Sequence, residues 1–177
     1  MNAADVQLRL ASLTDAVTIS ALSVQVFLDT YATEGVRPDL AREAFTQYSV
    51  EAFSRRLGEA QRKFVLAEAN NGLLGFAEIV VFDAPAPSGT LSGAELVRLY
   101  VQPASHGRGI GRALLSHAEQ LAVAASLPAM WLTVWDGNLK ALGFYFHIGY
   151  AEVGHTTYSF QGSTYANRVI VKHLVRS

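Results

Sequence analysis

Three glycines at alternate positions, Gly107, Gly109 and Gly111, stand between two apolar segments of different period. The run Leu96–Val101 before them reads as a strand, and apolar residues recur at helical spacing after them. The pattern predicts a strand, a tight glycine loop and a helix. A helix N-terminus carries roughly half a positive charge and amides without intrahelical partners, so this loop predicts a site for phosphate oxygens.

The spacing of these glycines excludes two common phosphate-binding loops. A dinucleotide fingerprint, G-x-G-x-x-G, fails because Arg112 stands where its last glycine would be. The nucleoside triphosphatase loop fails because no lysine follows the glycines. The phosphate must therefore belong to another class of ligand.

The segment Leu99-Tyr100-Val101-Gln102-Pro103, followed by His106-Gly107-Arg108-Gly109-Ile110-Gly111, resembles motif A of the GNAT superfamily of acyl-CoA-dependent N-acyltransferases. His106 departs from that motif, which usually has Arg or Gln there. The resemblance implies that the amides from Gly107 to Gly111, including Ile110, hold the pyrophosphate of acetyl-CoA. Arg108, Arg112 and a protonated His106 would add charge-assisted contacts.

A second resemblance to this superfamily lies downstream, in the pattern N-x-x-A-x-x-x-Y-x-x-x-G-[FY]. Its members here are Asn138, Ala141, Tyr145, Gly149 and Tyr150. Asn138 is suited to cap a helix and is expected at the cofactor. The resemblance assigns Tyr145 as the general acid for the leaving thiolate, and a phenol of pKa about 10 is protonated at neutral pH.

The general base has several candidates. Glu95 lies six residues before Val101, so both side chains share one face of a regular strand. Some members of the superfamily place a glutamate base there, and many use a water chain instead. Glu78 and Asp136, near other predicted strand ends, are alternatives. The Val101 amide is the expected donor to the thioester oxygen.

The rest of the chain supplies the elements that position these residues. The patterns predict a strand at 6–11, helices starting near Thr14, Pro38 and Ser49, and strands at 63–68 and 73–82 joined by an Asn70-Asn71-Gly72 turn. A surface loop at 83–89 precedes the motif A strand and helix. A strand at 129–135, a short helix through Tyr145 and strands at 150–160 and 165–175 complete the order.

This order matches the GNAT superfamily along almost the whole chain. The resemblance implies an α/β (α+β) fold, with a mixed central sheet of about seven strands flanked by helices and splayed between strands 4 and 5. It also implies one domain over residues 1–177, with the pantetheine arm pairing with the backbone of the segment Leu99-Tyr100-Val101.

Composition narrows the function classes. The chain has 177 residues, half of them apolar, a net charge of −1 and no cysteine. Disulfides, thiolate metal sites and cysteine nucleophiles are excluded, and the charge argues against nucleic-acid binding. No apolar stretch reaches about 18 residues, the N-terminus lacks the features of a signal peptide, and the histidines lack metal-ligand spacing. We expect a cytoplasmic protein without a metal or a membrane partner.

The sequence therefore predicts an N-acetyltransferase that moves the acetyl group of acetyl-CoA directly to a primary amine of a small molecule or a protein. The alternative is an acyl-CoA-binding regulatory module without turnover. The sequence does not identify the acceptor amine. The superfamily resemblance allows a homodimer, although the sequence contains no pattern that marks an interface.

Overall fold

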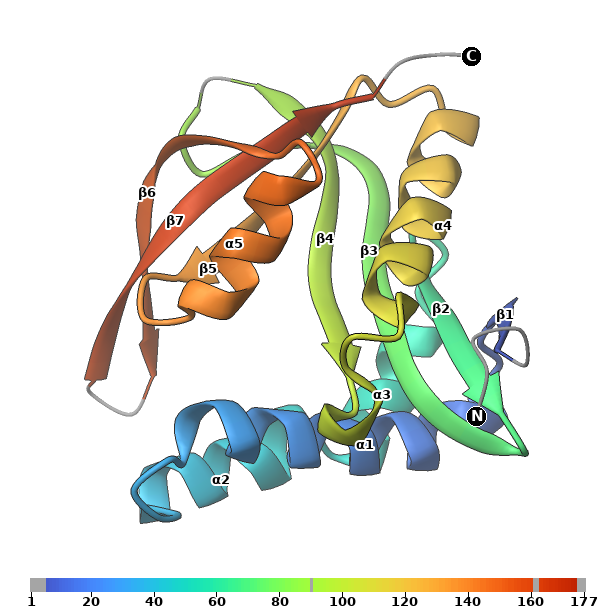
Figure 1. Ribbon diagram of the computed structural model, residues 1–177, viewed down its shortest axis with the longest axis vertical. Helices are drawn as coiled ribbons and strands as arrows, with labels where there is room; N and C mark the ends of the chain where they lie inside the picture. The colour runs from blue at the N-terminus through green and yellow to red at the C-terminus, as the bar shows by residue number, and fades with distance from the viewer. Residues whose placement is uncertain (1–5, 90, 161–162, 175–177) are drawn as a thin grey trace. The chain divides into compact units, whose positions relative to one another are not determined.

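The computed structural model describes residues 6–89, 91–160 and 163–174. Within them, seven strands form one mixed sheet in the order β1-β2-β3-β4-β5-β7-β6 (Figure 1). The strands are β1 Gln7–Leu10, β2 Arg62–Ala69, β3 Gly72–Pro85, β4 Ser92–Val101, β5 Ala129–Trp135, β6 Ala151–Phe160 and β7 Ser163–His173. β4 pairs with β5 in parallel, whereas β1–β2, β5–β7 and β6–β7 are antiparallel. The predicted fold class is confirmed.

The helices begin where the sequence supplies their first turns. They are α1 Ala16–Tyr31, α2 Pro38–Gln47, α3 Val50–Leu57, α4 Ile110–Ala124 and α5 Leu139–His147. Pro38 opens α2, and the Ser49 hydroxyl accepts the Ala52 amide at 3.2 Å before α3. In the described part of the chain, no helix has the length and apolar character needed to cross a membrane.

Two short segments show where the predicted boundaries hold and where they fail. Asn70 and Asn71 take φ values of 50° and 61°, the left-handed conformation that the predicted two-residue hairpin turn requires. The loop predicted at 83–89 is partly wrong, because β3 continues to Pro85. The Ala84 carbonyl accepts from the Trp131 indole at 3.1 Å, and the Ala86 amide donates to the Leu91 carbonyl at 2.9 Å, so the chain stays bonded past the predicted end of the strand. Val175, the predicted end of the last strand, lies outside the described residues.

The chain divides into two compact units, Met1–Ile79 with Arg98–Ala118, and Val80–Val97 with Glu119–Ser177. In the first unit, helices cover both faces of the sheet. Phe76 packs edge-on against Phe53 of α3, with ring centroids 6.2 Å apart. A Cβ at the preceding residue, Gly75, would lie 3.2 Å from Leu114 of α4. Consecutive strand residues face opposite sides, so α3 and α4 lie on opposite faces.

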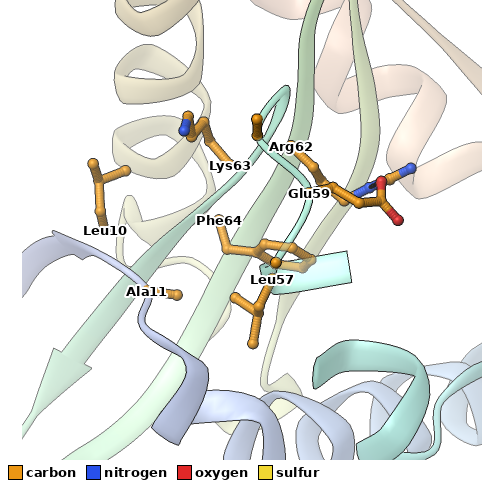
Figure 2. A pocket seen from close by; sticks show the side chains of 9 residues that line it. Leu10, Ala11, Leu57, Glu59, Arg62, Lys63 and Phe64 are labelled. Atoms are coloured by element: carbon orange, nitrogen blue, oxygen red, sulfur yellow. Dashed lines mark hydrogen bonds and ion pairs between the residues drawn. The ribbon is translucent and has the colours of Figure 1, made fainter. Parts of the chain in front are cut away.

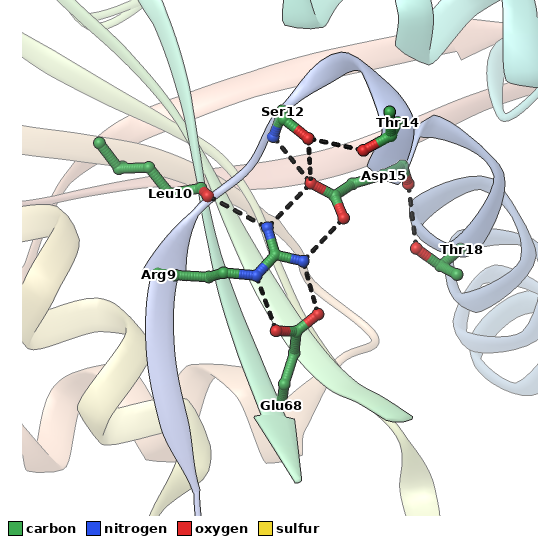
Figure 3. A network of polar contacts seen from close by, with 7 residues as sticks. All are labelled: Arg9, Leu10, Ser12, Thr14, Asp15, Thr18 and Glu68. Carbon is green, nitrogen blue, oxygen red and sulfur yellow. Dashed lines mark hydrogen bonds and ion pairs between the residues drawn. The ribbon is translucent and has the colours of Figure 1, made fainter. Parts of the chain in front are cut away.

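A polar network fixes the start of the first unit (Figure 3). The Arg9 guanidinium of β1 donates to Asp15 and to Glu68 of β2, each at 2.7 Å. Asp15 also accepts the Ser12 amide at 2.7 Å, in the short 3₁₀ turn Leu13–Asp15 before α1. The network joins β1, β2 and the entry to α1.

The core of the second unit lies along β5 and β7. Their register runs from Ala129–His173 to Trp135–Asn167. Trp131, Val169 and Val171 are buried together with Ala86 and Ala129. β4 joins β5 at the pairs Ala94–Met130 and Glu95–Trp131, so the residues of β4 from Leu96 onward follow the paired segment.

Candidate active site

The first unit contains the glycine loop, between the 3₁₀ turn Pro103–Ser105 and the first residue of α4, Ile110. Gly107 and Gly109 have φ values of +76° and +77°, which L side chains rarely adopt. A Cβ at either position would meet no atom within 4 Å among the described residues. Glycine is therefore required at these positions by the backbone conformation, and the space beside them is open.

The loop contains donors for which the structure shows no acceptor among the described residues. The first helical bond of α4 runs from the Ala113 amide to the Gly109 carbonyl at 3.0 Å, so the amides of Ile110, Gly111 and Arg112 precede the helical ladder. Arg108 Nη2 is buried, with no hydrogen-bond partner among the described residues. A buried guanidinium nitrogen in that state is costly unless an acceptor reaches it. The loop therefore fits an anionic ligand such as a diphosphate, whereas the Arg112 side chain is exposed.

His106 joins this loop to the end of β4. Its Nε2 lies 2.9 Å from the Val101 carbonyl oxygen, and because a carbonyl only accepts, the ring nitrogen donates. The imidazole is exposed. One of its two nitrogens is thus engaged by the chain itself, a contact that the motif did not predict.

The Tyr100 side chain is engaged by Tyr48. Its hydroxyl lies 3.2 Å from the Tyr48 hydroxyl, and burial raises its pKa well above the ordinary value. The neighbouring side chains of Leu99 and Val101 are half-buried.

The two alternative bases are both engaged by arginines. Glu78 is fully buried, and its two oxygens accept from Arg62 and Arg98 at 2.5 Å each. Asp136 accepts from Arg168 at 2.9 Å. Both alternative carboxylates are therefore held in ion pairs with arginine side chains.

Glu95, Asn138 and Tyr145 belong to the second unit. Glu95 is half-buried in β4, opposite Trp131 of β5. The Asn138 carbonyl accepts the Ala141 amide at 3.1 Å, which confirms the predicted cap of α5. The Tyr145 side chain, only 6% exposed, packs beside Phe144, and burial raises the pKa of its phenol. The phenol therefore stays protonated at neutral pH.

Comparison with known proteins identifies the kind of protein that carries these features. Residues 28–150 match the acetyltransferase (GNAT) family. The chain belongs to this family. As a GNAT protein it is an enzyme of the acyltransferase class, and both motif A and the Tyr145 pattern fall inside the matched range.

Individual GNAT relatives extend this result. A streptothricin acetyltransferase of Streptomyces lavendulae is 33% identical over 58% of the chain and 51% of its own length. An uncharacterized N-acetyltransferase of Mycobacterium bovis is 27% identical over 92% of the chain and all of its own length. The crystal structure of PaiA N-acetyltransferase from Thermoplasma acidophilum, in complex with coenzyme A, has a TM-score of 0.78, with 23% identity over 95% of the chain and 98% of its own. That structure shares the GNAT fold.

The sequence of this GNAT chain pointed to Glu78 as a possible base but not to the two arginines that bind it. The Arg62–Glu78–Arg98 cluster joins β2, β3 and β4, and the local signal for it was an acid inside the apolar run of β3. A pocket of about 220 Å³ also lies in the first unit (Figure 2). Glu59, Arg62 and Lys63 line it together with Leu10, Leu57 and Phe64, and it contains none of the predicted site residues.

Proposed function

We propose that this protein transfers the acetyl group of acetyl-CoA directly to a primary amine of a small molecule or a protein. The glycine loop before α4 carries the proposal. Its left-handed glycines leave open space, its first amides precede the helical ladder, and the buried Arg108 Nη2 has no acceptor among the described residues. On a chain of the GNAT family, these features support binding of an acyl-CoA diphosphate.

The proposed contacts with acetyl-CoA follow from the loop and the end of β4. Amides from Gly107 to Gly111 and the guanidinium groups of Arg108 and Arg112 would bind the diphosphate. The backbone of Leu99, Tyr100 and Val101 would pair with the amides of the pantetheine arm, with Asn138 also at the cofactor. We propose that His106 acts by holding the Val101 carbonyl, which it contacts at 2.9 Å.

Three residues would perform the chemistry once acetyl-CoA supplies the activated acyl group. The Val101 amide donates to the thioester oxygen as negative charge develops on it. Glu95, or a water chain, accepts the proton of the attacking amine. Tyr145 donates a proton to the sulfur as the carbon–nitrogen bond forms and the carbon–sulfur bond breaks. Direct transfer needs no covalent enzyme intermediate, because proximity alone can contribute about 7–11 kcal/mol at best.

The test is the release of free thiol from acetyl-CoA in the presence of a panel of primary amines. We expect release with at least one amine, and a decrease in kcat of about 10²-fold or more in Tyr145→Phe, the usual contribution of a general acid. Binding of acetyl-CoA, measured by calorimetry, should persist in that variant. Tyr158→Phe, at an exposed tyrosine of β6, removes the same group elsewhere and serves as the control.

Two outcomes contradict the proposal in different ways. Binding of acetyl-CoA without thiol release, for every amine, would indicate a regulatory module. Unchanged kcat in Tyr145→Phe would remove this phenol from the mechanism while leaving the acetyltransferase activity in place.

A further inference from the structure

The Tyr145 ring is held by a second tyrosine five residues later. After α5 the chain reverses at Gly149, whose φ of +95° is left-handed. The Tyr150 amide donates to the Tyr145 carbonyl at 3.1 Å. The two rings then meet edge-on, with centroids 5.5 Å apart and planes at 66°. The reversal therefore sets one aromatic ring against the other.

The far end of Tyr150 is anchored by charge. Its hydroxyl donates to Glu119 Oε1 of α4 at 3.1 Å. Lys172 of β7 donates to both oxygens of the same carboxylate, at 2.9 Å each. Tyr150 is 3% exposed, whereas the Glu119 and Lys172 side chains are 17% and 31% exposed. The Glu119–Lys172 pair thus lies at the edge of the core and holds the hydroxyl end of the buried Tyr150 ring.

We infer that Tyr150, tied to Glu119, is a positioning residue for Tyr145. This inference rests on the proposed role of Tyr145 as general acid. A proton donor must point at the sulfur within hydrogen-bond reach, and a tilt of its ring lowers the rate without unfolding the site. Tyr150 supplies an immobile surface for that ring, and Glu119 with Lys172 keeps Tyr150 in place.

Tyr150 cannot serve as the acid itself. Its hydroxyl proton already points at Glu119, and burial together with that negative charge raises its pKa. It therefore stays protonated and bonded to a carboxylate over the working pH range. Its contribution to turnover must pass through the ring it contacts.

The experiment compares kcat and KM for acetyl-CoA in four variants. Tyr150→Phe keeps the ring and removes the anchor, and Glu119→Ala removes the acceptor. We expect each to lower kcat by about two- to twelvefold, the range that corresponds to the loss of one hydrogen bond, with KM unchanged. Glu119→Gln keeps an acceptor for the Tyr150 hydroxyl and should retain most of the activity. Glu152→Ala, which releases Arg168 and His155 in the same unit, is the matched control.

A double-mutant cycle separates positioning from a general loss of structure. In the Tyr145→Phe background, Tyr150→Phe should cause no further decrease in kcat, because the group that it positions is gone. An equal decrease in both backgrounds, or no decrease in either, overturns the inference. If Tyr145→Phe lowers kcat but the cycle shows no coupling with Tyr150, the proposed function stands and only the inference about Tyr150 falls. If Tyr145→Phe has no effect, the inference falls together with the role of Tyr145.

Discussion

His106 Nε2 donates to the Val101 carbonyl across a distance of 2.9 Å, so a ring from the glycine loop is bonded to the last residue of β4. The two residues belong to the two parts of the proposed cofactor site, the loop that would bind the diphosphate and the strand that would bind the pantetheine arm. The bond thus links these two parts directly.

The His106→Ala variant should bind acetyl-CoA more weakly because the loop and the strand end are no longer joined. A neutral hydrogen bond contributes about 0.5–1.5 kcal/mol, which corresponds to an increase in Kd of roughly two- to twelvefold. Calorimetric titration with acetyl-CoA measures the Kd. His106→Gln can still offer a donor and should recover part of the loss, and His173→Ala, at an exposed histidine of β7, should bind as the native protein does. Equal Kd values for native and His106→Ala proteins would show that the contact is incidental.

Gly109→Glu should abolish binding of acetyl-CoA. At φ +77° any side chain strains the backbone, and this one would place a negative charge where the diphosphate is proposed to lie. Gly89 is a matched control because it also has a positive φ, +70°, and a Cβ added there would meet no atom within 4 Å among the described residues. Gly89→Glu should lose comparable stability but keep its affinity. Retained affinity in Gly109→Glu would place the cofactor elsewhere.

Features encoded within a few residues were predictable from the sequence. The turn at Asn70–Asn71, the Ser49 and Asn138 caps and the glycine loop each depend on local backbone chemistry, and the structure contains all of them. The order of the strands and helices was also predictable, because hydrophobic residues recur at different periods in strands and in helices.

Features that depend on partners far apart in sequence were not predictable. Glu78 bonds arginines 16 and 20 residues away, on two other strands, and no local spacing encodes that pairing. The Tyr150 hydroxyl finds Glu119 31 residues away. The Trp131 indole likewise bonds the Ala84 carbonyl near the end of β3, 47 residues away. Such pairings appear only when the sheet has assembled.

Glu78→Gln should destabilise the protein by about 3–5 kcal/mol, the cost of removing one partner from a buried ion pair. The neutral amide would remove the charge that Arg98 faces and would leave Arg62 with Glu59 alone, and the Glu78 side chain is 0% exposed. Urea unfolding measures the loss. Glu59→Gln removes another carboxylate from Arg62, but the Glu59 side chain is 46% exposed and its loss should cost about 1 kcal/mol or less. Similar losses in the two variants would show that burial of the Glu78 charge contributes nothing extra.

The Asp15 carboxylate should make stability depend on pH in the acid range. Hydrogen bonds from Arg9, then from Ser12, lower the pKa of Asp15 in the folded state below its ordinary value of about 3.9 (Figure 3). A depressed folded pKa contributes stability that is present above the unfolded pKa and is lost as the pH falls through the folded pKa. Asp15→Asn should therefore be less stable than the native protein at pH 7, by about 1 kcal/mol since Arg9 is partly exposed.

That difference should shrink as the pH falls below about 4, because acid protonates Asp15 in the native protein and removes the same charge. Thermal unfolding of both proteins between pH 7 and pH 3 follows the change. Asp39→Asn provides the comparison and should change stability less, because Asp39 pairs at 3.1 Å with an Arg37 side chain that is 57% exposed, so solvent screens the pair. A gap between native and Asp15→Asn proteins that stays constant down to pH 3 would mean that the Arg9 network stabilises the fold by geometry and not by the Asp15 charge.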